Sequence, residues 1–115
     1  MCIRDSQSTS HNQLYCPGVA TPSEAFSALD AGANALKFFP AEIIGPAGVK
    51  AMLAVLPRGT VTLPVGGIES TNMQEYLEAG ASGFGIGSSL FQPGLAMFEL
   101  ELRARQLAGK FEKIA

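Results

Sequence analysis

The chain has 115 residues, a formal net charge of −2 and 47% hydrophobic residues, which fits one globular unit with a modest core. The mildly acidic balance without a basic run gives no reason to expect nucleic-acid binding, and no apolar stretch has the length of a membrane span. The N-terminus lacks the apolar centre of a secretion signal and two cysteines are too few for a disulfide framework, so we expect a cytoplasmic protein.

Residues 1–13, "MCIRDSQSTSHNQ", are polar and show neither helical nor strand periodicity. We interpret them as a disordered or non-native leader, of the kind produced by reading through foreign sequence at the edge of a truncated frame. The one histidine, His11, lies in this segment, which argues against a histidine-based catalytic triad and against a His/Cys metal site. The expected domain is therefore 14–115.

Two strand–helix units are predicted in the first half of the domain, beginning at residue 14. "LYCPG" at 14–18 predicts a short strand, and "TPSE" at 21–24 predicts a helix N-terminus with a capping box and proline in the first turn. This helix is expected to reach about Ala31 and to stop at Gly32. The apolar run "ALKF" at 35–38 predicts the next strand, and Pro46 is expected to begin the second helix.

Two more units are predicted in the second half. "TVTLPV" at 60–65 indicates a strand, followed by a helix that Ser70 or Thr71 caps and Gly80 ends. "GFGI" at 83–86 indicates a fourth strand. The apolar spacing over about 94–113 predicts a last helix.

An internal repeat supports this division. "LDAGANAL" at 29–36 and "LEAGASGF" at 77–84 share one pattern, a helix end, a glycine stop and a strand start. Four successive βα units imply an α/β fold with a parallel sheet and right-handed crossovers. Because a (β/α)₈ barrel needs about 200 residues or more, the chain matches about half of a TIM barrel.

Lys37 stands inside the apolar strand, near its carboxyl end, where active sites of parallel α/β folds gather. Alternation places Lys37 on the face opposite Leu36 and Phe38. If the latter two pack on helices, Lys37 points into the barrel, where burial disfavours the charged amine and leaves a nucleophile toward carbonyls. The alternative is a lysine at a strand end whose amine reaches solvent.

Two glycine-rich segments, "VGGIES" at 65–70 and "GIGSSL" at 85–90, each follow a predicted strand. Glycines allow backbone N–H groups to approach an anion closely, and helix N-termini add positive potential. The loops after the last two barrel strands commonly bind phosphate, and Ser88 adds a hydroxyl donor. Phosphate binding is favoured over the alternative that the glycines only form tight turns.

The other charged residues are less informative. Glu42 follows the lysine strand and is placed to face the site, whereas Glu69 is expected to point outward because its charge would oppose an anion. The last helix carries a charged run that reads as a solvated face, with Arg103 and Arg105 among its members.

Three segments together resemble one enzyme family. "PGVATPSEAFSALDAGANALKFFPAEIIGP", "LPVGGIESTN" and "AGASGFGIGSSL" are similar to the class I 2-keto-3-deoxy-6-phosphogluconate and 6-phosphogalactonate aldolases. The likeness covers about residues 14–95, and the lysine strand with "KFFPAE" is its specific part. The resemblance implies the C-terminal half of a (β/α)₈ barrel, a homotrimer for the full-length family, and no metal or organic cofactor.

The resemblance also implies site roles. The Schiff-base lysine falls on Lys37, and the substrate- and phosphate-binding positions fall on Val65, Gly66, Gly67, Gly87 and Ser88. The residue before the Gly-Gly pair is typically threonine in the phosphogluconate enzymes, and Val65 stands there. A methyl group cannot hydrogen-bond the C4 hydroxyl, so the chain looks more like a 6-phosphogalactonate aldolase, a lyase that releases pyruvate and glyceraldehyde 3-phosphate.

One departure limits the expected activity. The family's general-base glutamate lies on an early strand, and this glutamate and a carboxylate-holding arginine have no counterpart in residues 1–13. We therefore expect this chain to behave as a poorly active fragment. The alternatives are the same reaction on the gluconate epimer, and a phosphate-binding half barrel without Schiff-base chemistry, similar to thiamine-phosphate synthases.

Overall fold

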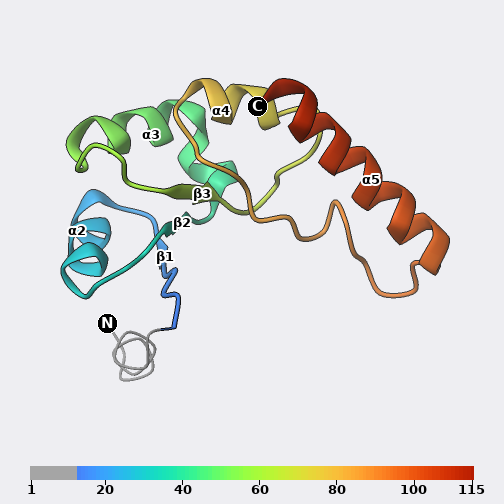
Figure 1. Ribbon diagram of the computed structural model, residues 1–115, viewed down its shortest axis with the longest axis horizontal. Helices are drawn as coiled ribbons and strands as arrows, with labels where there is room; N and C mark the ends of the chain where they lie inside the picture. Colours follow the sequence, from blue (N-terminus) through green and yellow to red (C-terminus); the bar gives the residue numbers. More distant parts are fainter. Residues whose placement is uncertain (1–12) are drawn as a thin grey trace.

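A computed structural model describes residues 13–115 and shows a parallel sheet flanked by helices (Figure 1). The sheet has the order β1-β2-β3, with β1 at Gly18–Val19, β2 at Leu36–Phe38 and β3 at Thr62–Pro64. The helices are α2 at Pro22–Asp30, α3 at Ala41–Val55, α4 at Met73–Glu78 and α5 at Met97–Ile114. The alternating order and the parallel pairing confirm the predicted α/β class.

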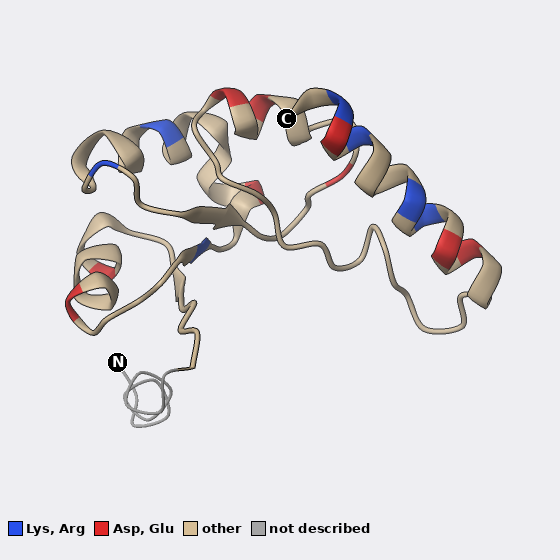
Figure 2. Ribbon diagram, viewed as in Figure 1, with Lys and Arg blue, Asp and Glu red and all other residues tan. Residues whose placement is uncertain are grey.

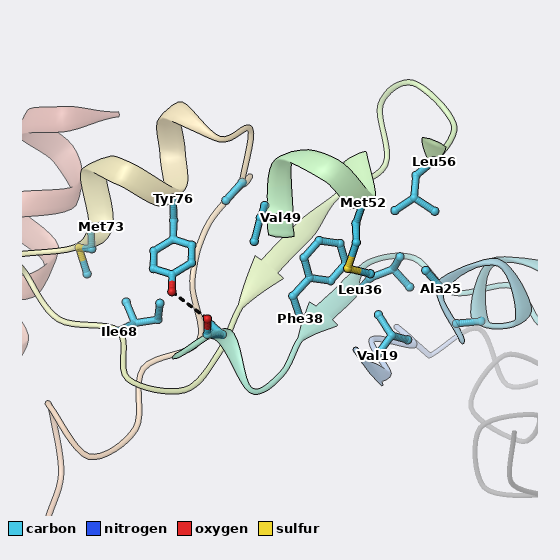
Figure 3. Packing of buried hydrophobic residues seen from close by; sticks show 13 residues of the cluster. Val19, Ala25, Leu36, Phe38, Val49, Met52, Leu56, Ile68, Met73 and Tyr76 are labelled. Carbon is cyan, nitrogen blue, oxygen red and sulfur yellow. Dashed lines mark hydrogen bonds between the residues drawn. The ribbon is translucent and has the colours of Figure 1, made fainter. Parts of the chain in front are cut away.

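The strand alternation separates the two faces of the sheet. Leu36 and Phe38 are fully buried and pack with residues of α2 and α3, among them Ala25, Val49 and Met52 (Figure 3). Lys37 lies between them on the opposite face, in register with Gly18 of β1 and Leu63 of β3. One face of β2 therefore forms the core and the other carries the lysine.

The start of α2 follows the predicted capping signal. The Thr21 hydroxyl accepts a hydrogen bond of 3.2 Å from the Glu24 N–H, and Pro22 stands in the first turn. The Glu24 carboxylate accepts in return from the Ala20 N–H at 3.1 Å. The helix ends at Asp30, just before Gly32 with its positive φ of 93°, so the predicted boundaries of this helix are confirmed.

Helix α3 begins earlier than predicted. A first turn starts at Ala41, and Gly45 interrupts it with φ 70° and ψ 167° before Pro46 opens the longer part. The predicted helix from Pro46 is thus the second segment of a kinked helix. The short first turn matters for the site, because it follows the lysine strand directly.

Two predictions about the strands need correction. The strand predicted at 14–18 is observed at Gly18–Val19, since Pro17 has no N–H to pair and contributes only its carbonyl, which accepts from the Lys37 N–H at 2.9 Å. The predicted fourth strand at 83–86 is reduced to one parallel bridge between Val65 and Gly85. The described sheet therefore has three strands rather than four.

The cap predicted for α4 is also wrong. The N-cap is Asn72, rather than Ser70 or Thr71, and its side chain makes no capping bond to the helix. Instead, the Asn72 side chain accepts from the Glu69 N–H at 2.9 Å and donates to the Gly67 carbonyl at 2.8 Å. Local hydrogen bonds within the preceding loop therefore precede this helix start in place of a side-chain cap.

Helix α5 lies beside the last glycine-rich segment, and none of its residues is fully buried. Its contact with the rest of the chain includes Phe111, whose ring meets Phe84 edge-on at 6.0 Å between centroids. Leu107 and Ile114 also pack against the core, while Ala104 is exposed. No helix within residues 13–115 has the length and apolar character needed to cross a bilayer.

Candidate functional site

Lys37 projects from the face of the sheet that the helices leave open. Its side chain is exposed, while its neighbours Leu36 and Phe38 have no accessible surface. Of the two alternatives for this amine, burial does not hold for the described chain and exposure to solvent does, because nothing within residues 13–115 covers this face well enough to exclude water. The predicted side of the strand is correct, because Leu36 and Phe38 on the opposite face are buried. Figure 2 marks the basic residues along the ribbon in blue, β2 among the elements that carry one.

The end of the lysine strand is hydrogen-bonded to the first glycine-rich segment. The Val65 N–H donates to the Phe38 carbonyl at 2.9 Å, and the Ala41 N–H donates to the Val65 carbonyl at 2.8 Å. Val65 is thus held from both sides by residues that immediately follow Lys37. The lysine strand and the Gly66–Gly67 pair therefore form one connected unit of the site.

Both glycines of this pair adopt backbone conformations that side chains rarely reach. Gly66 has φ 106° and Gly67 has φ 69°. A Cβ atom at Gly67 would also lie 2.9 Å from a carboxylate oxygen of Glu42. The prediction that Glu42 faces the site agrees with this placement, since its carboxylate lies against the Gly-Gly pair.

Val65 lies on the same side of the sheet as Lys37 by alternation along β3, where Leu63 is in register with Lys37. Its side chain packs over Gly85: a Cβ atom there would lie only 2.5 Å from a Val65 methyl carbon. The predicted specificity residue therefore lies on the lysine face, in contact with Gly85 at the start of the second glycine-rich segment.

The second segment is tied to the first by a serine that the sequence analysis did not single out. The Ser89 hydroxyl donates to the Ile68 carbonyl at 2.7 Å. Gly87 and Ser88, the predicted phosphate-binding residues, are exposed beside this link. A Cβ atom at Gly87 would meet no heavy atom within 4 Å, so its backbone is open to a ligand.

A cavity of about 400 Å³ opens between the two glycine-rich segments and α5. Ser70, Ser88 and Ser89 line one side, and Arg103 of α5 lines another. Glu69 also lines this cavity and is exposed, so the expectation that its side chain points outward stays a prediction. Arg103, assigned from sequence to a solvated helix face, is half-buried here. No local sequence pattern indicates that Arg103 lies beside the glycine-rich segments, because this depends on how α5 packs.

Electrostatic coupling links Lys37 to Cys16 of the segment before β1. Burial raises the pKa of the Cys16 thiol above its usual range, and the Lys37 ammonium partly offsets this rise. Cys16 is half-buried and in the free thiol state. Among the described residues, no three histidine, cysteine or acidic side chains are grouped closely enough to hold a metal ion.

Comparison with known proteins gives this arrangement its context. The family model described as "KDPG and KHG aldolase" matches residues 4–101. The chain belongs to the KDPG and KHG aldolase family. The segment predicted as a leader lies, apart from Gln13, outside the described residues, and its non-native origin stays a prediction.

Individual relatives point to one branch of this family. The chain is 47% identical over 88 residues to the "Probable 2-dehydro-3-deoxy-6-phosphogalactonate aldolase" of Rhizobium meliloti (strain 1021), covering 76% of this chain and 42% of the relative. It is 43% identical over 98 residues to the 2-dehydro-3-deoxy-6-phosphogalactonate aldolase of Escherichia coli (strain K12), covering 85% of this chain and 46% of the relative. The chain thus spans about half the length of these curated relatives.

A solved structure confirms the fold class. The structure titled "Native KDPGal structure" superposes with a TM-score of 0.92 at 36% identity, covering 95% of this chain and 53% of that one. The family's fold over this half is therefore the C-terminal part of a (β/α)₈ barrel, as predicted, with the fourth strand reduced as described above.

Proposed function

We propose that this chain carries the Schiff-base half of a class I aldolase that cleaves 2-dehydro-3-deoxy-6-phosphogalactonate, with Lys37 as the nucleophile. The observation that carries this proposal is the pair of hydrogen bonds through Val65, which hold the end of the Lys37 strand against Gly66 and Gly67. A reactive amine and an anion-binding backbone then lie in one unit, beside the loop that bears Gly87 and Ser88. The names of the two relatives above support the choice of substrate.

The reaction follows from the chemistry of an amine and a 2-keto acid. Nζ of Lys37 in its neutral form attacks the C2 carbonyl, and loss of water gives a protonated imine. The imine accepts the electron pair of the C3–C4 bond as it breaks, while a base takes the C4 hydroxyl proton. Glyceraldehyde 3-phosphate leaves, C3 of the enamine is protonated, and hydrolysis releases pyruvate and frees Lys37.

The glycine-rich segments hold the phosphate in this proposal. The backbone N–H groups of Gly66, Gly67 and Gly87 and the hydroxyl of Ser88 bind its oxygens. Because the phosphate lies at C6, this contact orients the substrate without touching the bonds that change.

Val65 contributes to the choice between the two C4 epimers. Its methyl groups offer no hydrogen bond to the C4 hydroxyl, unlike a threonine at the same place. Val65→Thr is therefore expected to raise reaction with the gluconate epimer relative to the galactonate epimer. Assays with both epimers side by side measure this ratio, and an unchanged ratio would remove Val65 from specificity.

Reduction in the presence of substrate tests the proposal. The chain is mixed with either phosphorylated epimer, reduced with borohydride, digested and analysed by mass spectrometry. An adduct on the Lys37 peptide is expected, with the pyruvate mass where C3–C4 cleavage has occurred and with the intact sugar-acid mass where it has not. Absence of either adduct from folded protein would favour phosphate binding without Schiff-base chemistry.

Assembly and location complete the proposal. The full-length enzyme is proposed to act as a cytoplasmic homotrimer. Light scattering on the purified chain measures its own assembly, and a monomer would mean that residues 1–115 do not carry the trimer contacts.

A further inference from the structure

The cavity between the glycine-rich segments and α5 is built mainly from hydrogen-bonding groups. Ser70, Ser88, Ser89 and Gln92 line it, together with Arg103 and Glu69. Its volume of about 400 Å³ suits a small ligand. The Ser89 hydroxyl is already used by the Ile68 carbonyl, so Ser88 and Ser70 are the hydroxyl groups left to meet a ligand.

Arg103 has no partner in the described structure. Its residue is half-buried, and within residues 13–115 its guanidinium makes neither an ion pair nor a hydrogen bond. Arg105, two positions away on the same helix, differs in both respects. Its side chain is 77% exposed and forms a 2.6 Å ion pair with Glu101. An unpaired, partly buried guanidinium beside free hydroxyl groups is a site for an anion.

We propose that Arg103 is a substrate-binding residue that supplies the positive charge for the substrate's phosphate group, at the Ser88 end of the site. This inference rests on the proposed function for the identity of the ligand. The planar guanidinium donates two parallel hydrogen bonds to phosphate oxygens while the Ser88 hydroxyl donates a third. Helix α5 then takes part in substrate binding, in addition to covering Phe84.

Glu69 sets the strength of this contact. Glu69 lines the same cavity, and its carboxylate carries the sign of charge that repels phosphate. The Glu69 N–H is held by Asn72 at 2.9 Å, which fixes the backbone from which the carboxylate extends. Glu69→Gln removes the charge and keeps the shape, so it is expected to tighten phosphate binding, in the opposite sense to loss of Arg103.

Titration with inorganic phosphate, followed by the backbone amide NMR shifts of Gly87 and Ser88, tests this role. Arg103→Gln is expected to weaken binding by about tenfold, as loss of a charge-assisted contact does, while Arg105→Gln stays within about twofold. Arg103→Lys keeps the charge without the planar fork and is expected to fall between them. Equal affinities for wild type, R103Q and R105Q, or shifts that never appear in the wild type, would overturn the inference.

Trapping with pyruvate separates this inference from the proposed function. Pyruvate has no phosphate, so reduction with borohydride should label Lys37 equally in wild type and R103Q. Labelling in both with a selective loss of phosphate affinity in R103Q supports both ideas. A selective affinity loss without any labelling supports the anion site and overturns the aldolase, and labelling with unchanged phosphate affinity overturns only the role of Arg103.

Discussion

The buried Tyr76 hydroxyl of α4 donates a 2.9 Å hydrogen bond to the carbonyl of Ala41, the first residue of α3 (Figure 3). The N–H of the same Ala41 donates to Val65. Tyr76 therefore holds the turn that follows the lysine strand, four positions after Lys37, and connects the hydrophobic core to the candidate site.

Tyr76→Phe is expected to lower the free energy of unfolding by about 1 to 2 kcal/mol, since it removes this buried hydrogen bond. Urea titration followed by circular dichroism measures the change. A Tyr76→Phe protein as stable as the wild type would show that the bond contributes nothing.

The same tyrosine predicts behaviour at high pH. Burial, and then the carboxylates of Glu75 and Glu42, raise the pKa of Tyr76 above its usual range. The unfolded chain therefore loses this proton first, and stability falls as pH rises above about 10. Unfolding measured at a series of alkaline pH values should show a shallower decline for Tyr76→Phe. Parallel declines in the two proteins would contradict the assignment.

Two of the three glycines in the proposed phosphate site, Gly67 and Gly87, should respond differently to alanine. Gly67→Ala places a Cβ at positive φ and against Glu42, so we expect a loss of about 1 to 2 kcal/mol in stability. Gly87→Ala meets open space and should leave the melting temperature nearly unchanged, while its methyl group obstructs the approach of phosphate. Thermal melts with and without phosphate compare the two. Equal destabilisation by both variants would contradict this account.

Cys16 reports on the charge of Lys37. In a Cys2→Ser background, alkylation of the one remaining thiol should need a pH above the ordinary cysteine range, because burial raises its pKa. Lys37→Met removes the ammonium that lowers this pKa, so the midpoint of the rate against pH should move higher still. Lys50→Met is the matched control and should not move it. A midpoint that stays in place in Lys37→Met would show that the two groups are not coupled.

Local sequence signals predicted those parts of the fold that depend on near neighbours. Thr21 and Glu24 meet across one turn, so the start of α2 could be read from their spacing. For α4 the sequence favoured Ser70 or Thr71, whereas the N-cap is Asn72. The Asn72 side chain bonds to the Glu69 N–H and the Gly67 carbonyl, three and five positions earlier, and this loop arrangement is not a helix-capping pattern that spacing predicts.

The candidate site also has features that the local sequence predicts and features that depend on tertiary packing. Alternation along β2 correctly separated Lys37 from Leu36, because it is a property of one strand. The sequence left open whether the Lys37 amine is buried or reaches solvent, since this depends on what lies over the sheet. The sequence assigned Arg103 to a solvated helix face for a related reason. Only the packing of α5 brings it to the cavity that Ser88, more than a dozen positions earlier in the chain, also lines.

Pyruvate trapping tests the central claim most directly. The chain is incubated with pyruvate, reduced with borohydride and mapped by peptide mass spectrometry, with Lys37→Met and Lys50→Met treated alongside. The account predicts one modified peptide, the one that contains Lys37, present in Lys50→Met and absent from Lys37→Met. Folded wild-type protein with no adduct, or with label spread evenly over Lys37, Lys50 and Lys110, would contradict it.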